Sequence, residues 1–178
     1  YLTFTAEGAQ TFKMTVTGGY DLSGKFEYSV NGGEWYEVVA DKEVPFGGTN
    51  GTLSLRGTNL RGTGESVAKY SKITFTDPSV KVACTGDIRT LLNHANYKNV
   101  ATNQARFYYL FENCEALTSA PDLPAESIAD HCYFSMFSGC KNLKSAPELP
   151  AKILATGCYD KMFKSPRSPN FACYNVSF

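Results

Sequence analysis

The first eighty residues alternate apolar and polar side chains in short runs. In the stretch 11–17, Phe12, Met14 and Val16 occupy every second position, with lysine and threonine between them. A period of two is typical of a strand that buries one face. The same pattern, rich in threonine, tyrosine, valine and phenylalanine, predicts strands over 1–5, 11–17, 25–30, 34–39, 43–45, 52–56 and 71–76.

Glycine and asparagine separate these runs. Asn31-Gly32-Gly33 lies between two predicted strands, and Asn-Gly readily supplies the positive φ angles of a hairpin turn. Further glycine turns follow at 47–51 and 62–64. Short strands joined by glycine turns predict a small antiparallel β-sandwich, immunoglobulin-like, over residues 1–80.

Composition changes near residue 80. Residues 1–83 hold twelve of the fifteen glycines and the single tryptophan, Trp35, whereas all six cysteines follow. The cysteines are Cys84, Cys114, Cys132, Cys140, Cys158 and Cys173. We therefore expect a second module over residues 81–178, with the junction near Pro78.

An internal repeat with a period of 26 residues occupies the second module. Residues 112–137 and 138–163 are identical at 13 of 26 aligned positions, nearly all of them apolar or small. Charge reverses between the copies at Glu115/Lys141 and Glu126/Lys152, so these positions are expected to face water. Constant apolar positions and variable polar ones are typical of a stacked solenoid.

The period and the pattern Leu-x-x-x-Pro-x-Leu-Pro favour the leucine-rich-repeat class. Each rung is expected to contribute a short strand, at 117–123, and a one-turn helix, at 132–137. Residues 86–111 fit the frame loosely and are predicted to form a degenerate N-terminal cap, and a degenerate C-terminal cap is expected after 163. The predicted fold class is mixed and mainly β: an N-terminal antiparallel β-sandwich followed by a short leucine-rich-repeat solenoid with 26-residue rungs.

Two segments of the repeat carry a family resemblance. They read FENCEALTSAPDLPA (111–125) and CYFSMFSGC (132–140), and they resemble the repeats of BspA-type leucine-rich-repeat surface proteins of gut anaerobes. YSVNGGEW (28–35) and VACTGDI (82–88) resemble the module that precedes such repeats. The resemblance implies a bacterial cell-surface protein, often lipid-anchored, that binds host or bacterial proteins. The present array is much shorter than many in that family.

Charge and hydropathy exclude several partners. Seventeen Lys and Arg balance seventeen Asp and Glu, for a net charge of +0. Nucleic acid is not an expected partner, because phosphate backbones call for a clustered basic surface. No apolar run approaches the roughly 18 residues of a membrane helix. Membrane association is expected only through a lipid anchor outside this chain.

The repeat also decides how the cysteines are interpreted. Equivalent positions in adjacent rungs lie about 4.8 Å apart, whereas a disulfide needs Cβ atoms about 3.8 Å apart. Free, buried thiols are therefore favoured, and disulfides remain the alternative. Cys-x-x-Cys and His-x-x-x-His pairs are absent, so no metal site is predicted. No cofactor motif is present either.

Asp130-His131-Cys132 contains the residue types of a cysteine nucleophile. In the second copy Cys132 recurs as Cys158, but His131 becomes Gly157 and the aspartate becomes threonine. The cysteine is thus expected to be structural and the histidine an exposed loop residue. His94 is likewise expected in a solvated loop. No catalytic residues are predicted, and the chain is expected not to be an enzyme.

Four aromatic residues are the candidate binding residues. Phe134 is replaced by Asp160 in the second copy, so it is expected to be exposed, and Tyr108 is its counterpart one rung earlier. Together they form the predicted contact surface on the repeats. Trp35 and Tyr36 follow the hairpin turn, and strand alternation is expected to put one in the core and the other on the surface.

The predicted function is non-enzymatic binding of an extracellular protein, from the matrix or a bacterial surface, on the repeat surface. The expected location is extracellular, at the bacterial cell surface and associated with the outer membrane. Two alternatives remain. One is a glycan-binding accessory module centred on Trp35 and Tyr36, and the other is a structural spacer.

Overall fold

The regular structure is almost entirely β, which confirms the mainly β class. The structure is a computed structural model, and it describes residues 1–164; the predicted C-terminal cap and Cys173 lie outside this range. The strands are β1 Leu2–Ala6, β2 Gln10–Thr17, β3 Phe26–Val30, β4 Tyr36–Glu37, β5 Val44–Phe46, β6 Leu53–Gly57, β7 Gly64–Ser66, β8 Lys69–Phe75, β9 Val82–Thr85 and β10 Leu117–Ser119. Three short 3₁₀ helices join them: η1 Gly48–Asn50, η2 Ile88–Leu91 and η3 Tyr97–Asn99.

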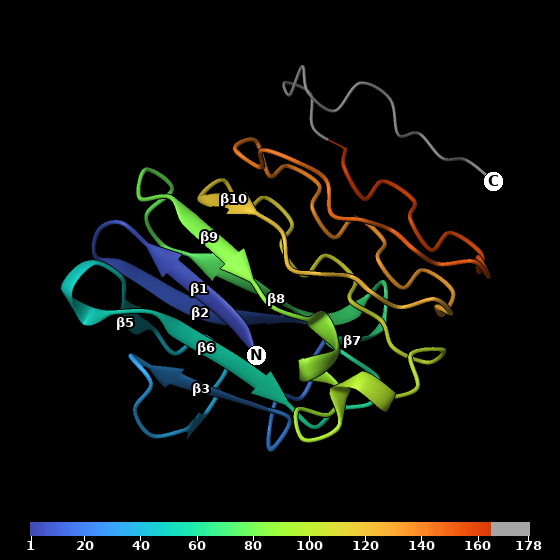
Figure 1. Cartoon of the computed structure of the whole chain (residues 1–178), viewed down its shortest axis with the longest axis horizontal. Helices are drawn as coiled ribbons and strands as arrows, with labels where there is room; N and C mark the ends of the chain where they lie inside the picture. Colours follow the sequence, from blue (N-terminus) through green and yellow to red (C-terminus); the bar gives the residue numbers. More distant parts are fainter. Residues whose placement is uncertain (165–178) are drawn as a thin grey trace.

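The strands form two sheets that lie one behind the other (Figure 1). The six-stranded sheet has the order β10-β9-β1-β6-β3-β4, and the four-stranded sheet has the order β5-β2-β8-β7. Phe4 of β1 contacts Phe12 and Phe75 of the second sheet, with ring centroids 6.0 and 5.4 Å away. The sheets therefore bury their facing sides against each other, as period-two alternation predicts.

The predicted hairpin forms around Asn31 and Gly32. These residues have φ angles of 52° and 68°, and the Gly33 amide donates to the Val30 carbonyl at 3.0 Å. Antiparallel pairing follows, with Tyr28 opposite Tyr36. The alternation of β2 is confirmed too, since Phe12 and Met14 are buried.

Two strands were not predicted. β7 pairs with β8, and β9 lies in the segment interpreted as a linker between the modules. β9 pairs antiparallel with β1 and parallel with β10 of the first repeat. Val82 and Cys84 bury their side chains, so this short segment has the alternation of a strand although it is only four residues long.

β9 joins the sandwich to the repeats in one sheet. The Ser119 hydroxyl accepts from the Cys84 amide at 2.9 Å and donates to the Cys84 carbonyl at 2.8 Å. Thr118 also donates, to the Val82 carbonyl at 3.1 Å. The sheet therefore crosses the predicted junction near residue 80 without interruption.

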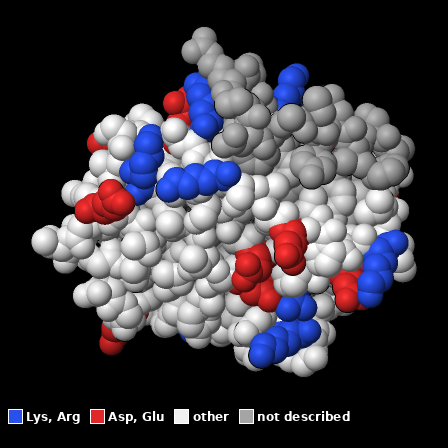
Figure 2. Space-filling view, turned by 45° about the horizontal axis from the view of Figure 1, so that its top comes forward, with Lys and Arg blue, Asp and Glu red and all other residues white. Residues whose placement is uncertain are grey.

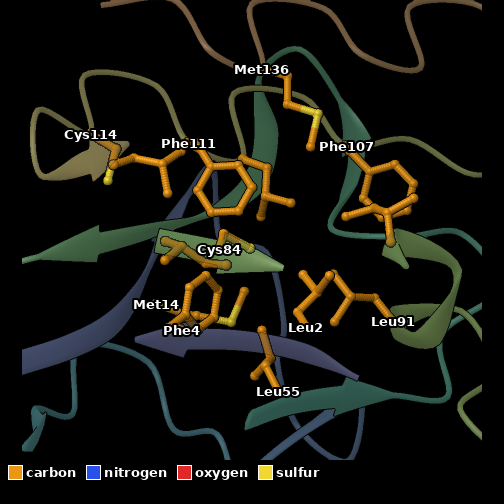
Figure 3. Packing of buried hydrophobic residues seen from close by; sticks show 14 of the residues in the cluster. Leu2, Phe4, Met14, Leu55, Cys84, Leu91, Phe107, Phe111, Cys114 and Met136 are labelled. Atoms are coloured by element: carbon orange, nitrogen blue, oxygen red, sulfur yellow. The ribbon is translucent and has the colours of Figure 1, made fainter. Parts of the chain in front are cut away.

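One hydrophobic core also spans both halves of the chain. Figure 3 shows Phe111 and Phe107 of the repeat region above β9, with Phe4 and Leu2 of the first strand below it. The rings of Phe4 and Phe111 are 6.3 Å apart. The first repeat turn thus completes the core of the two-sheet region.

The structure corrects the predicted elements of the rung. The strand expected at 117–123 is limited to β10, Leu117–Ser119. The helix expected at 132–137 is a series of turns. His131 and Ser135 have φ angles of 55° and 50°, and a left-handed residue every fourth position cannot belong to a right-handed helix.

The turns of successive repeats stack through main-chain hydrogen bonds. The amides of Tyr133, Ser135 and Phe137 donate to carbonyls exactly one repeat further on, less one residue, at 2.9, 3.0 and 2.9 Å. The acceptors are Cys158, Asp160 and Met162. One repeat earlier, the amides of Phe107, Tyr109 and Phe111 donate to Cys132, Phe134 and Met136 in the same way. This is the pattern of parallel strand pairing at an offset of 26 residues.

Phe4→Ala is expected to lower the free energy of unfolding by about 3–5 kcal/mol, the usual cost of removing a buried phenylalanine. Because Phe4 contacts both the second sheet and Phe111, a single cooperative transition should shift for the whole chain. Urea unfolding followed by far-UV circular dichroism and by Trp35 fluorescence measures this.

Thr5→Ala is the matched control, because Thr5 is the next residue of β1 and is exposed. It is expected to change stability by less than about 0.5 kcal/mol. Two separate transitions, with only one shifted by Phe4→Ala, would contradict a shared core.

Candidate binding surfaces

Two columns of stacked rings build the turn side of the repeats. Phe107, Tyr133 and Tyr159 form one column, with centroids 6.0 and 5.8 Å apart and rings within 11° of parallel. The second column consists of Phe111, Phe137 and Phe163 at 5.5 and 5.7 Å. Identical side chains in identical conformations stack in this way because the main chain repeats its path.

Left-handed residues recur in each rung at the same places. Tyr109, Ser135 and Lys161 have φ angles of 55°, 50° and 55° and are 26 residues apart. Asn113 and Gly139 form a second such set. At Gly139 (φ 76°) a Cβ would lie 2.2 Å from the Asn113 side-chain oxygen, so this turn requires glycine.

Reversed charges pair between rungs. Lys141 forms an ion pair with Glu115, and Lys152 forms one with Glu126 at 3.1 Å. The expectation that these residues face water is confirmed, since all four side chains are substantially exposed. Exposed pairs contribute little to stability, but opposite charges at a spacing of 26 favour this register.

Phe134 belongs to an aromatic surface that differs from the predicted one. Its ring lies 5.4 Å from that of Tyr109, and Tyr109 in turn lies 4.5 Å from Tyr70 of β8. Phe134 is half-buried, with Lys161 Nζ 5.4 Å above its ring and His131 5.7 Å away. We call Tyr70, Tyr109 and Phe134, with Lys161 and His131 at one end, the aromatic row.

Tyr108 is not part of this surface, so that prediction was wrong. It is only 5% exposed. Gly64 of β7 lies against it so closely that a Cβ there would come within 2.6 Å of the tyrosine ring. The first sheet region covers this position of the first rung, whereas nothing equivalent covers Phe134 in the second.

Tyr109 and Tyr70 were missed by the sequence analysis. Tyr109 aligns with Ser135, which gives no sign of an aromatic surface, and its left-handed conformation turns the side chain toward Tyr70 and Phe134. Burial, with Tyr70 and Glu112 nearby, raises the pKa of Tyr109. Adjacent aromatic residues at 107–109 were the one available signal.

The interpretation of Trp35 and Tyr36 was also wrong in part, because neither lies in the core. Trp35 is half-buried against Tyr1, 4.9 Å away, and its ring lies 4.0 Å from the Arg56 guanidinium. His94 lies 6.3 Å from Tyr1 and is half-buried rather than solvated. The side chains around Trp35 therefore form a surface cluster.

Tyr36 is 55% exposed at the edge of a groove of about 580 Å³. Its ring lies 5.8 Å from that of Tyr28. Glu34, Lys42 and Asn50 bring a carboxylate, an ammonium and an amide to the same groove. The groove thus combines an aromatic surface with hydrogen-bonding groups.

The Asp130-His131-Cys132 segment does not assemble as a catalytic group. Cys132 is 1% exposed, and burial raises its pKa to about 12. His131 is half-buried and lies against Phe134 and Gly157, and Asp130 accepts a hydrogen bond from the Thr156 amide at 3.0 Å. Each side chain therefore has a role in stacking the rungs.

The five cysteines within residues 1–164 are free and buried. Burial is the main cause that raises the pKa of each thiol, to about 12 for Cys114. The Cys140 thiol donates to the Phe111 carbonyl at 2.9 Å. The prediction of unpaired thiols that pack as small apolar side chains is confirmed for these five.

Charged side chains lie in small groups of both signs on the face shown in Figure 2. In the described part of the chain, no group of three or more His, Cys, Asp or Glu side chains is placed to hold a metal ion. No helix between residues 1 and 164 is long and apolar enough to cross a membrane.

Comparison of the chain with protein-family models, curated proteins and solved structures finds no match.

Alkaline pH is expected to destabilise the protein through Cys114 and Cys132. Unfolded thiols ionise near pH 8.5, whereas these two titrate near 12 in the folded protein. Their contribution is therefore complete below about pH 8.5 and is lost as the pH rises toward 12. Urea unfolding at pH 8 and pH 10.5 measures the fall in the free energy of unfolding.

Cys132→Ala provides the comparison for this effect. The variant should be less stable than the wild type at pH 8, but its stability should fall less between the two pH values. An equal fall in both proteins would show that Cys132 does not contribute to the pH dependence.

Proposed function

We propose that the chain is a non-enzymatic binding protein of the cell surface that recognises an extracellular protein through the aromatic row. One observation carries this proposal. Tyr70, Tyr109 and Phe134 form an unbroken line of partly exposed rings, 4.5 and 5.4 Å apart, that crosses from β8 onto two successive rungs. Aromatic side chains are enriched among the residues that dominate protein–protein binding energies.

The support beneath the row favours the same function. Main-chain hydrogen bonds of 3.0 Å join the rungs of Tyr109 and Phe134, and those of Ser135 and Asp160. A surface held in this way loses little conformational freedom on binding, which lowers the entropic cost of association. Lys161 adds one positive charge at the end of the row, beside Phe134.

We further propose that the repeats form a short leucine-rich-repeat solenoid of the BspA type. The 26-residue offset of the hydrogen bonds, the recurring left-handed residues and the burial of Leu117 and Leu143 support this. A location at the bacterial surface, with any lipid anchor outside this chain, goes with the same resemblance.

Phe134→Asp is expected to weaken protein binding by more than about 10-fold, the loss typical of a central aromatic contact. Asp160 occupies the equivalent position of the next rung, so an aspartate is compatible with the fold there. Biolayer interferometry against immobilised extracellular matrix proteins and mucin measures the change.

Leu60→Asp is the matched control, because Leu60 is 56% exposed outside the aromatic row. It should leave binding unchanged. Equal loss in both variants would place the contact elsewhere, and saturable binding by neither the wild type nor any variant would favour the structural spacer.

Glycan binding is the second candidate, because the groove beside Tyr36 combines an aromatic ring with polar groups. Tyr36→Ala is then expected to abolish binding on a saccharide array, since the ring would supply the stacking surface. Phe134→Asp should have no effect on that array. Sugar binding that survives Tyr36→Ala would remove this groove from consideration.

A further inference from the structure

The last described rung is less well covered than the rung before it. Tyr133 and Phe137 are each 1% exposed, because a further rung lies over them. Their equivalents Tyr159 and Phe163 are only partly buried. The turn side of the array therefore presents the edge of a ring column at Tyr159.

Main-chain donors at this edge show the same difference. The amides of His131, Tyr133 and Ser135 donate to carbonyls of the following rung at 2.9–3.0 Å. Among residues 1–164, the equivalent amides of Gly157, Tyr159 and Lys161 have no main-chain oxygen as acceptor. Amides aligned for parallel pairing call for another segment of the same conformation.

The sequence contains such a segment. The stacked turns begin with the motif Cys-Tyr-x-x-x-Phe, as CYFSMF at 132–137 and CYDKMF at 158–163. The motif occurs once more, as CYNVSF at 173–178. The spacing from Cys158 to Cys173 is 15 residues, so the third copy is out of the 26-residue frame and is hidden when the repeats are aligned at constant period.

We propose that residues 173–178, which lie outside the described part of the chain, form a shortened final rung that covers the turn side of residues 158–163. Tyr174 stacks on Tyr159, and Phe178 extends the phenylalanine column. Main-chain carbonyls of this segment accept from the amides of Tyr159 and Lys161. The rung is shortened because it omits the strand side of the repeat.

Chain length permits this arrangement. Nine residues, 164–172, connect Phe163 to Cys173 and can span about 30 Å, whereas a rung of six residues covers at most about 20 Å. Pro166 and Pro169 lie in this connection, where their missing amides remove no bond from the stack. The connection is therefore long enough to return to the start of the row.

Omitting the strand side has a visible counterpart. Leu149 and Leu154 are 36% and 43% exposed, whereas the equivalent Leu123 and Ile128 of the previous rung are 3% and 4% exposed. The motif at 173–178 carries no counterpart of these leucines. A cap limited to the turn side accounts for both the motif and the leucines that stay exposed.

Amide hydrogen exchange of the full 178-residue chain, measured by NMR, tests the proposal. The amides of Tyr159 and Lys161 should be protected in the wild type. Tyr174→Asp and Phe178→Asp should each speed their exchange by at least tenfold, since an aspartate cannot replace a stacked ring. Asn175→Asp is the matched control, because its position in the motif is that of the exposed Asp160, and it should leave exchange unchanged.

Three outcomes would overturn the proposal. The amides of Tyr159 and Lys161 could exchange as fast as those of an unfolded peptide in the wild type. They could be equally protected in all four proteins, which would mean that another segment covers them. Protection that rises with protein concentration, together with a dimer in analytical ultracentrifugation, would identify a second copy as the cover.

Discussion

Main-chain hydrogen bonds between successive rungs determine the positions of all the side chains in the repeat half. The bonds from Tyr133 to Cys158 and from Tyr109 to Phe134 follow one offset, so equivalent side chains must lie directly above one another. Ring columns, buried thiols and reversed charge pairs are consequences of that single constraint. The same constraint places Tyr109 and Phe134 in contact, although neither belongs to a ring column.

The short strand β9 transmits this order to the rest of the molecule. It pairs with β1 on one side and β10 on the other, so the repeats continue a sheet instead of following a flexible linker. Two good repeats bury too little surface to be stable alone, since arrays usually need about three. Packing Phe111 against Phe4 supplies the missing neighbour for the first rung.

Much of this could be predicted from the sequence where the pattern is periodic. Alternation located β2 and the hairpin around Asn31, and the repeat located the buried cysteines. What could not be predicted depends on contacts between distant segments. Tyr108 is buried only because β7 covers it, and Trp35 is drawn to the surface by Tyr1 and Arg56. The turns at 132–137 have a helix-like spacing of rings, and only the positive φ angles of His131 and Ser135 distinguish them from a helix.

The left-handed residues at positions 109, 135 and 161 limit how such an array can change in length. Inserting or deleting one residue within a rung would move every later donor off its acceptor and every later ring off its column, so such changes should be strongly selected against. Duplication or loss of a whole 26-residue unit preserves all these contacts. Gene-level variation of this array is therefore expected to proceed in steps of complete rungs, with single-residue insertions and deletions confined to the loops between them.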